Sequence, residues 1–178
     1  MEERTFVVRS DYDHKTLTVM ARALRKTQRR VLSTVIRVFG WTAVVLDAAL
    51  NLLMIAFGMF TWDFGEVVLL LALAVLLGIS LFEDQLNAKI AAWQMLPGIK
   101  EGETRFTEAE YTVTTPAIST TYHYENIRTV CETAEYFVFF LSRRHGQIYP
   151  KSGFVEGSPE TFRDWISQRT GKTVVYVR

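Results

Sequence analysis

The sequence predicts an α+β membrane protein: a hairpin of two transmembrane helices, followed by a small antiparallel sheet or partial barrel that a C-terminal helix closes. The first observation is charge segregation. Between Val38 and Phe82 the ionisable side chains are Asp47, Asp63 and Glu66, whereas the chain on either side is rich in charge. The second is a change of pattern after residue 97, where apolar residues follow the alternation of strands.

Two apolar runs are long enough to cross a bilayer. Residues 38–60 would extend roughly 34 Å as a helix and residues 64–82 roughly 28 Å, against a hydrocarbon core of about 30 Å. The link between the runs is so short that the two helices must be antiparallel neighbours. Both are apolar on all sides, which a small soluble protein could not easily cover.

Basic residues flank the first run on one side. They are Arg22, Arg25, Lys26, Arg29, Arg30 and Arg37, whereas the link between the runs contains no Lys or Arg. Because short cytoplasmic segments carry the excess of Lys and Arg, we expect a multi-pass protein of the cytoplasmic membrane with both termini in the cytoplasm.

The N-terminal arm predicts a strand at 5–9 and then a helix capped by Asp13. From Leu17, apolar residues at helical spacing predict one amphipathic helix that runs towards the first span. Its basic residues Arg22, Arg25, Lys26, Arg29 and Arg30 would lie near anionic headgroups. They would either set the topology alone or recognise specific lipids.

Strand patterns follow the hairpin. The predicted strands are 104–106, 111–115, 118–124, 127–131, 136–141 and 147–149, with a hairpin turn at 143–146. The run 136–141 is apolar on both faces, so we expect both of its faces to be covered. Ser158, Pro159 and Glu160 predict a helix start, and Gly171 its end. The extended tail 173–177 is expected at a sheet edge, paired with residues 6–8.

These patterns divide the chain into four parts. Residues 1–37 form the N-terminal strand and basic helix, and residues 38–82 form the transmembrane hairpin. Residues 83–96 continue the helix as a linker, which Pro97 and Gly98 end. Residues 97–178 form the C-terminal domain. Cys131 is the single cysteine, so an intrachain disulfide is excluded.

The C-terminal domain contains a set of mostly apolar residues at fixed spacings. They are Tyr124, Ile127, Val130, Glu132, Thr133, Tyr136 and Phe137, then Ile148, Tyr149, Pro150, Lys151 and Phe154, then Phe162, Trp165 and Ile166. This pattern resembles the YcxB-like family of bacterial membrane proteins. The resemblance implies a C-terminal domain similar to bacterial pleckstrin-homology-like domains. Related membrane-anchored proteins are linked to envelope stress and to immunity against peptide toxins, and the family has no established biochemical activity.

Motifs for catalysis are missing from the sequence. His14, His123 and His145 fall in separate segments and none has ligand spacing with Cys131, so we predict no metal site. The chain has neither a phosphate-binding glycine loop nor a nucleophile motif. We therefore expect no enzyme and no cofactor.

Asp47 and Asn51 form a polar pair on one face of the first span, since they are four residues apart. A carboxylate there costs about 3 kcal/mol on insertion scales, so it needs compensation. Two interpretations stay open: a hydrogen-bonded contact that holds the hairpin or an oligomer together, or part of a proton or ion path.

These observations favour a membrane-anchored binding or scaffold module. Its cytoplasmic domain would hold a protein, peptide or lipid headgroup at the bilayer surface, with Arg143, Arg144 and Lys151 as candidate contacts. The alternative is a subunit of a small oligomeric channel or transporter that uses Asp47. A homo-oligomer is compatible with both, and nucleic acid is not an expected partner, since the basic cluster has no interleaved aromatics.

Overall fold

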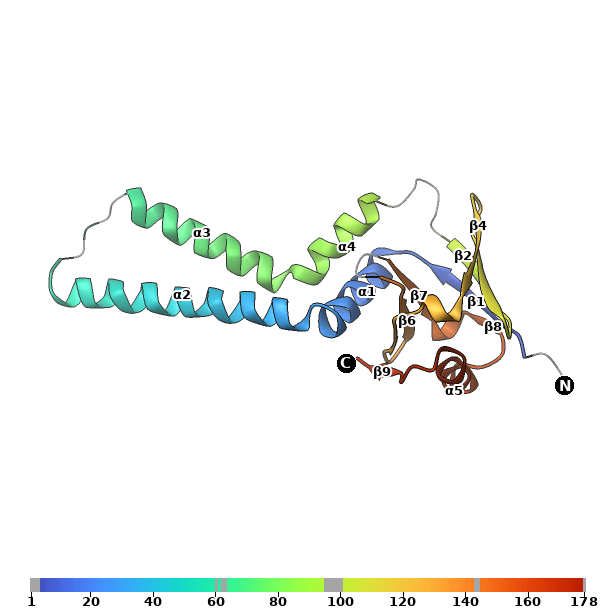
Figure 1. The fold of residues 1–178 in the computed structure, drawn as a ribbon. Helices are drawn as coiled ribbons and strands as arrows, with labels where there is room; N and C mark the ends of the chain where they lie inside the picture. Colours follow the sequence, from blue (N-terminus) through green and yellow to red (C-terminus); the bar gives the residue numbers. More distant parts are fainter. Residues whose placement is uncertain (1–3, 60, 62–63, 95–100, 143–144, 178) are drawn as a thin grey trace.

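The computed structural model describes residues 4–59, 61, 64–94, 101–142 and 145–177, which form an α+β fold. The α-helices are α1 (His14–Thr27), α2 (Arg30–Ala56), α3 (Phe64–Leu81), α4 (Glu83–Gln94) and α5 (Pro159–Thr170). The strands are β1 (Phe6–Asp11), β2 (Glu101–Phe106), β3 (Glu110–Thr114), β4 (Ser119–His123), β5 (Thr129–Glu132), β6 (Tyr136–Phe140), β7 (Gly146–Pro150), β8 (Phe154–Glu156) and β9 (Val175–Tyr176). Helices α2 and α3 form an arm that projects from a body of sheets (Figure 1).

The body contains two sheets. The five-stranded sheet has the order β4-β3-β2-β1-β8 and is antiparallel throughout. The four-stranded sheet has the order β7-β6-β5-β9, with antiparallel pairs except for the parallel β5–β9 pair. Strand β1 precedes the helical arm in sequence, yet it lies between two strands that follow the arm. The N-terminal segment therefore belongs to the same sheet as the C-terminal half of the chain.

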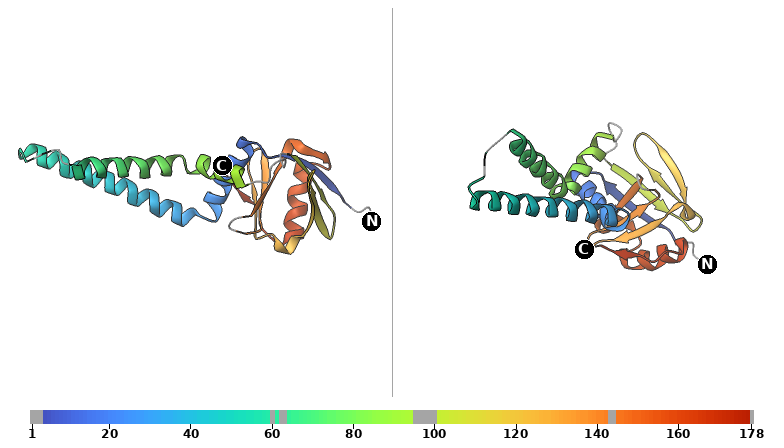
Figure 2. Two further views of the ribbon diagram at one scale, coloured as in Figure 1. Left: turned by 90° about the horizontal axis from the view of Figure 1, so that it is seen from above. Right: turned by 60° about the vertical axis from the view of Figure 1, so that its left-hand side comes forward.

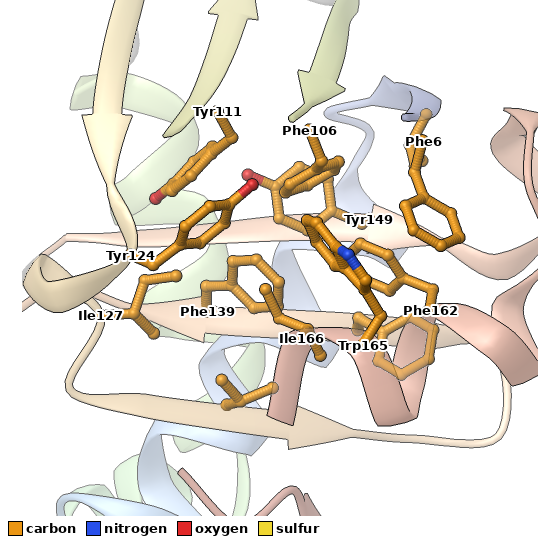
Figure 3. Close-up of a cluster of buried hydrophobic side chains, with 13 residues drawn as sticks. Phe6, Phe106, Tyr111, Tyr124, Ile127, Phe139, Tyr149, Phe162, Trp165 and Ile166 are labelled. Atoms are coloured by element: carbon orange, nitrogen blue, oxygen red, sulfur yellow. The ribbon is translucent and has the colours of Figure 1, made fainter. Parts of the chain in front are cut away.

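An aromatic core fills the space between the sheets (Figure 3). Phe6 from β1, Phe106 from β2 and Phe139 from β6 converge there, and α5 contributes Phe162 and Trp165. The rings pack mostly edge to face; the Phe106 and Phe162 centroids, for example, are 4.9 Å apart. Burial of so much aromatic area is the main force that holds the sheets and α5 together.

Strand β6 is covered on both faces, as its sequence predicts. Phe137 and Phe139 face the aromatic core, whereas Tyr136, Val138 and Phe140 belong to a second cluster on the other face. Helix α1 covers that second cluster with Ala23, Val19, Met20 and Leu24. The amphipathic face of α1 thus packs on a sheet.

The predicted single amphipathic helix is wrong, because it divides into α1 and α2. The Leu24 carbonyl accepts hydrogen bonds from the backbone N–H groups of both Gln28 and Arg29, which ends α1. Helix α1 is held on the four-stranded sheet, so the chain must change direction to form the arm. Val31 and Val35, which continue the apolar spacing, are exposed on α2.

The tail pairs differently from its prediction. Strand β9 runs parallel to β5, with Cys131 opposite Val175 and Glu132 opposite Tyr176. The predicted partner, residues 6–8, is already paired on both sides, with β2 and with β8. Strand β5 pairs with β6 on one side and takes the tail on the other, where the burial of Val177 fixes the tail.

Helix ends follow the local signals. Asp13 accepts a hydrogen bond from the Thr16 backbone N–H, and Ser158 accepts one from that of Thr161. Gly171 ends α5 with a φ of +62°, in the left-handed region that favours glycine. The predicted helix break at 97–98 lies outside the described residues.

Helices α2 and α3 are long and apolar enough to cross a membrane, judged by length and composition. They pack against each other over part of their length, and α1 packs beside α4 (Figures 1 and 2). In the most apolar 18-residue stretch of α2 no residue is buried, and in the corresponding stretch of α3 6% of the residues are buried. The arm therefore exposes apolar side chains on nearly all sides.

Candidate functional site

A basic pocket lies where α1, α2 and the C-terminal tail meet. Its volume is about 520 Å³. The lining residues are Arg25, Lys26 and Thr27 at the end of α1, Arg30, Ser33, Thr34 and Arg37 on α2, and Val175, Tyr176 and Val177 in the tail. We refer to this site as the basic pocket.

The α2 side of the basic pocket is one helical stripe. Arg30, Ser33, Thr34 and Arg37 are spaced at i, i+3, i+4 and i+7, so they share a face of the helix. Arginine guanidinium groups and hydroxyl groups are the donors that phosphate and carboxylate groups prefer. The stripe is therefore suited to an anion.

Two acidic residues at the start of α4 neutralise part of this charge. Arg25 donates two hydrogen bonds to Asp84, of 2.7 and 2.8 Å, and Arg22 Nε lies 3.7 Å from the same carboxylate. These bonds raise the pKa of the Arg25 guanidinium above its ordinary value. The Ser33 hydroxyl donates to Glu83 Oε2 over 2.7 Å. Within the described part of the chain, neither Arg30 nor Arg37 has an acidic partner.

The structure distributes the predicted basic residues over several surfaces. Lys26 and Arg30 line the basic pocket together with Arg25. Arg22 lines a separate pocket beside β5 and β6, and Arg29 lines another between α1 and α4. Their predicted contact with anionic headgroups stays a prediction.

A polar cluster interrupts the apolar arm. Asn51 Nδ2 lies 3.4 Å from Asp47 Oδ2 and 2.6 Å from Glu66 Oε1. The first contact is within α2 and the second joins α2 to α3. One amide thus contacts two carboxylates, and the contact across the hairpin has the geometry expected for an interaction that holds the helices together.

Lys151 has a partner inside the body. Its Nζ donates to Glu132 Oε1 over 2.6 Å and lies 5.2 Å from the centroid of the Phe137 ring. Arg163 Nε lies 3.1 Å from the other oxygen of Glu132. The Lys151 side chain is 24% exposed and that of Glu132 10%, so this cluster ties β5 to the turn after β7 and to α5. Arg143 and Arg144 lie outside the described residues.

Residues 106–166 match the family model described as YcxB-like protein. This part of the chain is YcxB-like. The YcxB-like segment runs from the end of β2 into α5 and excludes the arm and the tail. Comparison with curated proteins gives no match. Comparison with solved structures gives none either.

The residues that carry the resemblance have structural roles in the YcxB-like segment. Ile127, Phe162 and Ile166 are fully buried in the aromatic core, and Glu132 pairs with Lys151. The pattern therefore specifies packing and one buried ion pair, and the basic pocket lies outside the matched segment.

Sequence reasoning missed several residues of these sites. Glu66 lies in the second predicted span, 64–82, with no predicted contact to Asp47 or Asn51, and no sequence signal connects Asp84, Tyr176 or Val177 with the basic residues. Glu66 could have been found, because it is one of few ionisable residues in the apolar region. The tail had no such signal. Among the described residues, no group of three or more His, Cys, Asp or Glu side chains could hold a metal ion.

Proposed function

We propose that this protein is a membrane-anchored binding module, in which the arm of α2 and α3 inserts into the bilayer and holds the body at its cytoplasmic surface. The observation that carries the proposal is the exposure of apolar side chains all round the arm. A core helix of a soluble protein would be mostly buried. In water so large an apolar surface would be unfavourable, whereas in lipid it needs no cover.

The topology of the five-stranded sheet supports the two-span arrangement. Strand β1 comes before the arm and pairs with β2, which comes after it. Both flanks of the arm must therefore lie on the same side of a membrane, which requires an even number of crossings. The basic residues next to α2 and their absence from the link favour the cytoplasmic side.

The architecture of the body supports a pleckstrin-homology-like module. Two largely antiparallel sheets enclose one core, and a single helix, α5, closes it. Modules of this kind present surface sites while their interior serves packing. A role in envelope stress or in immunity to a peptide toxin would build on such binding, and it follows from the family resemblance alone.

Cysteine labelling in native membranes tests the topology. Met59, near the tip of the arm, and Arg4, just before β1, are replaced by cysteine one at a time. A membrane-impermeant thiol reagent applied from outside should label the Met59 variant and leave the Arg4 variant unlabelled until the membrane is broken. Cys131 is fully buried, so labelling of this natural cysteine should add little background signal. Labelling of both variants from one side, or release of the protein by alkaline carbonate, would refute the anchor.

Recovery of the full chain from native membranes tests the binding role. We expect a distinct lipid, peptide or protein to be recovered with the wild type and equally with Asp47→Ala, because Asp47 does not line the basic pocket. A preparation that retains no lipid and no partner contradicts the proposal.

The polar cluster favours a second candidate function, a subunit of an oligomeric channel or transporter. Asp47 and Glu66 bring two carboxylates to one place in the apolar arm, which is an arrangement able to pass a proton or cation. Two helices enclose no pore, so this function requires several copies. It predicts a flux in liposomes that Asp47→Ala abolishes, and a strictly monomeric protein in mild detergent excludes it.

A further inference from the structure

An apolar groove shares the lining residue Arg37 with the basic pocket. The groove has a volume of about 210 Å³ and lies between α2 and α3. Its lining is Val35, Ile36, Arg37, Phe39 and Gly40 from α2, and Leu76, Leu77 and Ser80 from α3. Arg37 lines both the groove and the basic pocket. The basic pocket and the apolar groove therefore meet at one residue.

This combination matches the two chemistries of a phospholipid. Arg30 and Arg37, two helical turns apart on one stripe, offer guanidinium donors to a phosphate, and the Thr34 hydroxyl lies between them on the same face. The groove offers an apolar wall to an acyl chain. A free phosphate would use the basic pocket and gain nothing from the groove.

We propose that one anionic phospholipid binds here, with its headgroup phosphate against Arg30 and Arg37 and an acyl chain between α2 and α3. The inference rests on the proposed insertion of the arm, because that insertion brings the groove to the depth of the acyl chains. The pocket also includes Tyr176 and Val177, so the bound headgroup touches the tail that pairs with β5. The lipid thus joins the arm to the body.

The charge around the pocket favours an anionic lipid over a zwitterionic one. Four basic residues line the pocket, Arg25, Lys26, Arg30 and Arg37, and two acidic residues, Glu83 and Asp84, stand at the start of α4. Asp84 is occupied by Arg25, and Glu83 by the Ser33 hydroxyl. A positive field therefore remains at the mouth of the pocket. A zwitterionic headgroup would bring its own cation into that field.

Native mass spectrometry of the full chain in detergent tests the site. Phosphatidylglycerol and phosphatidylcholine with identical acyl chains are titrated separately, and inorganic phosphate is added as a competitor. The wild type should bind one phosphatidylglycerol in preference to phosphatidylcholine. The variant Arg30→Gln/Arg37→Gln should lose about tenfold or more in affinity for phosphatidylglycerol.

Two further variants separate the specific site from general attraction. Arg22→Gln/Arg29→Gln removes the same charge from the same cluster but leaves the basic pocket intact, so its affinity should stay within about threefold of the wild type. Gly40→Leu should fill the groove, because a Cβ added at Gly40 meets no atom within 4 Å. It should weaken phosphatidylglycerol binding and leave the effect of inorganic phosphate unchanged.

The outcomes distinguish this inference from the proposed anchor. Equal losses in the two double variants would show diffuse surface attraction and overturn the site. Full competition by inorganic phosphate, with no effect of Gly40→Leu, would show a free-anion site and overturn the lipid. Either result leaves the anchor intact, provided that every variant resists carbonate extraction. Release of the wild type by carbonate overturns the anchor and the lipid together.

Discussion

The thiol of Cys131 is buried between β5 and α1. The residue is fully buried in the second cluster, and burial raises the pKa of its thiol to about 11 from an ordinary value of 9.0. A buried neutral thiol is a poor nucleophile, because the thiolate is the reactive form. The single cysteine of the chain therefore has a packing role and can report on unfolding.

We expect native protein to react with a thiol reagent at pH 8 at about a hundredth of the rate of urea-unfolded protein, or slower. Because the folded thiol keeps its proton longer than the unfolded one, its contribution to stability is complete below about pH 9 and is lost as the pH rises towards 11. With an aromatic disulfide as the reagent, the absorbance of the aromatic thiolate that the reagent releases measures the rate. Equal rates for native and unfolded protein would contradict the buried position.

Lys151 compensates a carboxylate that the fold has buried. The variant Lys151→Met should destabilise the body by about 2 kcal/mol, because the Glu132 carboxylate loses its shorter ion pair. The loss is limited because Arg163 still lies beside the same carboxylate. Chemical unfolding of the full chain in detergent, followed by near-ultraviolet circular dichroism, measures the change. Lys172→Met, at an exposed position, is the control and should change stability by less than about 0.5 kcal/mol. A similar small change for Lys151→Met would show that the ion pair contributes little.

At the scale of elements, α1 packs against two neighbours. One face packs on the four-stranded sheet and another lies along α4, where Arg25 meets Asp84. Helix α4 continues from α3, since the Leu86 backbone N–H donates to the Phe82 carbonyl. The α1–α4 pair is thus the joint through which the arm is attached to the body.

The variant Asp84→Asn should loosen this joint. We expect faster hydrogen exchange in 83–94 and in 14–27, and unchanged exchange in β6, because the ion pair is partly buried and both helices depend on it. The matched control is Glu103→Gln, which breaks an exposed ion pair with Arg9 and should leave exchange in both helices unchanged. Unchanged exchange in α4 of Asp84→Asn would show that apolar packing alone holds the joint.

Sequence predicted the elements whose signals are local. The Ser158 cap, the Gly171 end and the two-faced apolar run of β6 are properties of neighbouring residues. Strand β8 was missed because three residues give too little pattern. The break between α1 and α2 and the pairing of β9 depend on what each segment packs against, and no local spacing encodes that.

The same distinction separates the predicted from the missed parts of the site. The polar pair Asp47–Asn51 follows from helical spacing, and its contact with Glu66 depends on the register of two helices. The stripe Arg30–Arg37 can likewise be read from spacing. The tail residues that complete the basic pocket come from the far end of the chain, and only the fold brings them there.

At the scale of the whole molecule, β1 determines whether the body can close. Val8 is fully buried and its strand pairs on both sides. We expect Val8→Asp to prevent closure of the body and to make it sensitive to limited proteolysis, since an unpaired charge in the core costs several kcal/mol. Val155→Asp, at a position 54% exposed, is the matched control and should keep the resistance of the wild type. A resistant Val8→Asp protein would show that the sheet tolerates loss of this strand.

The position of β1 in the sheet also determines the order in which the strands can pair during synthesis. The ribosome releases β1 first, then the whole arm, and only afterwards β2 and β8, between which β1 must lie. Under the proposed insertion of the arm, the first strand therefore waits, unpaired, while the two apolar helices enter the membrane. A chain whose N-terminus was translocated by error would leave β1 on the wrong side and its partners with open edges. Under the same proposal, we expect misinserted copies to expose incomplete sheets to proteases.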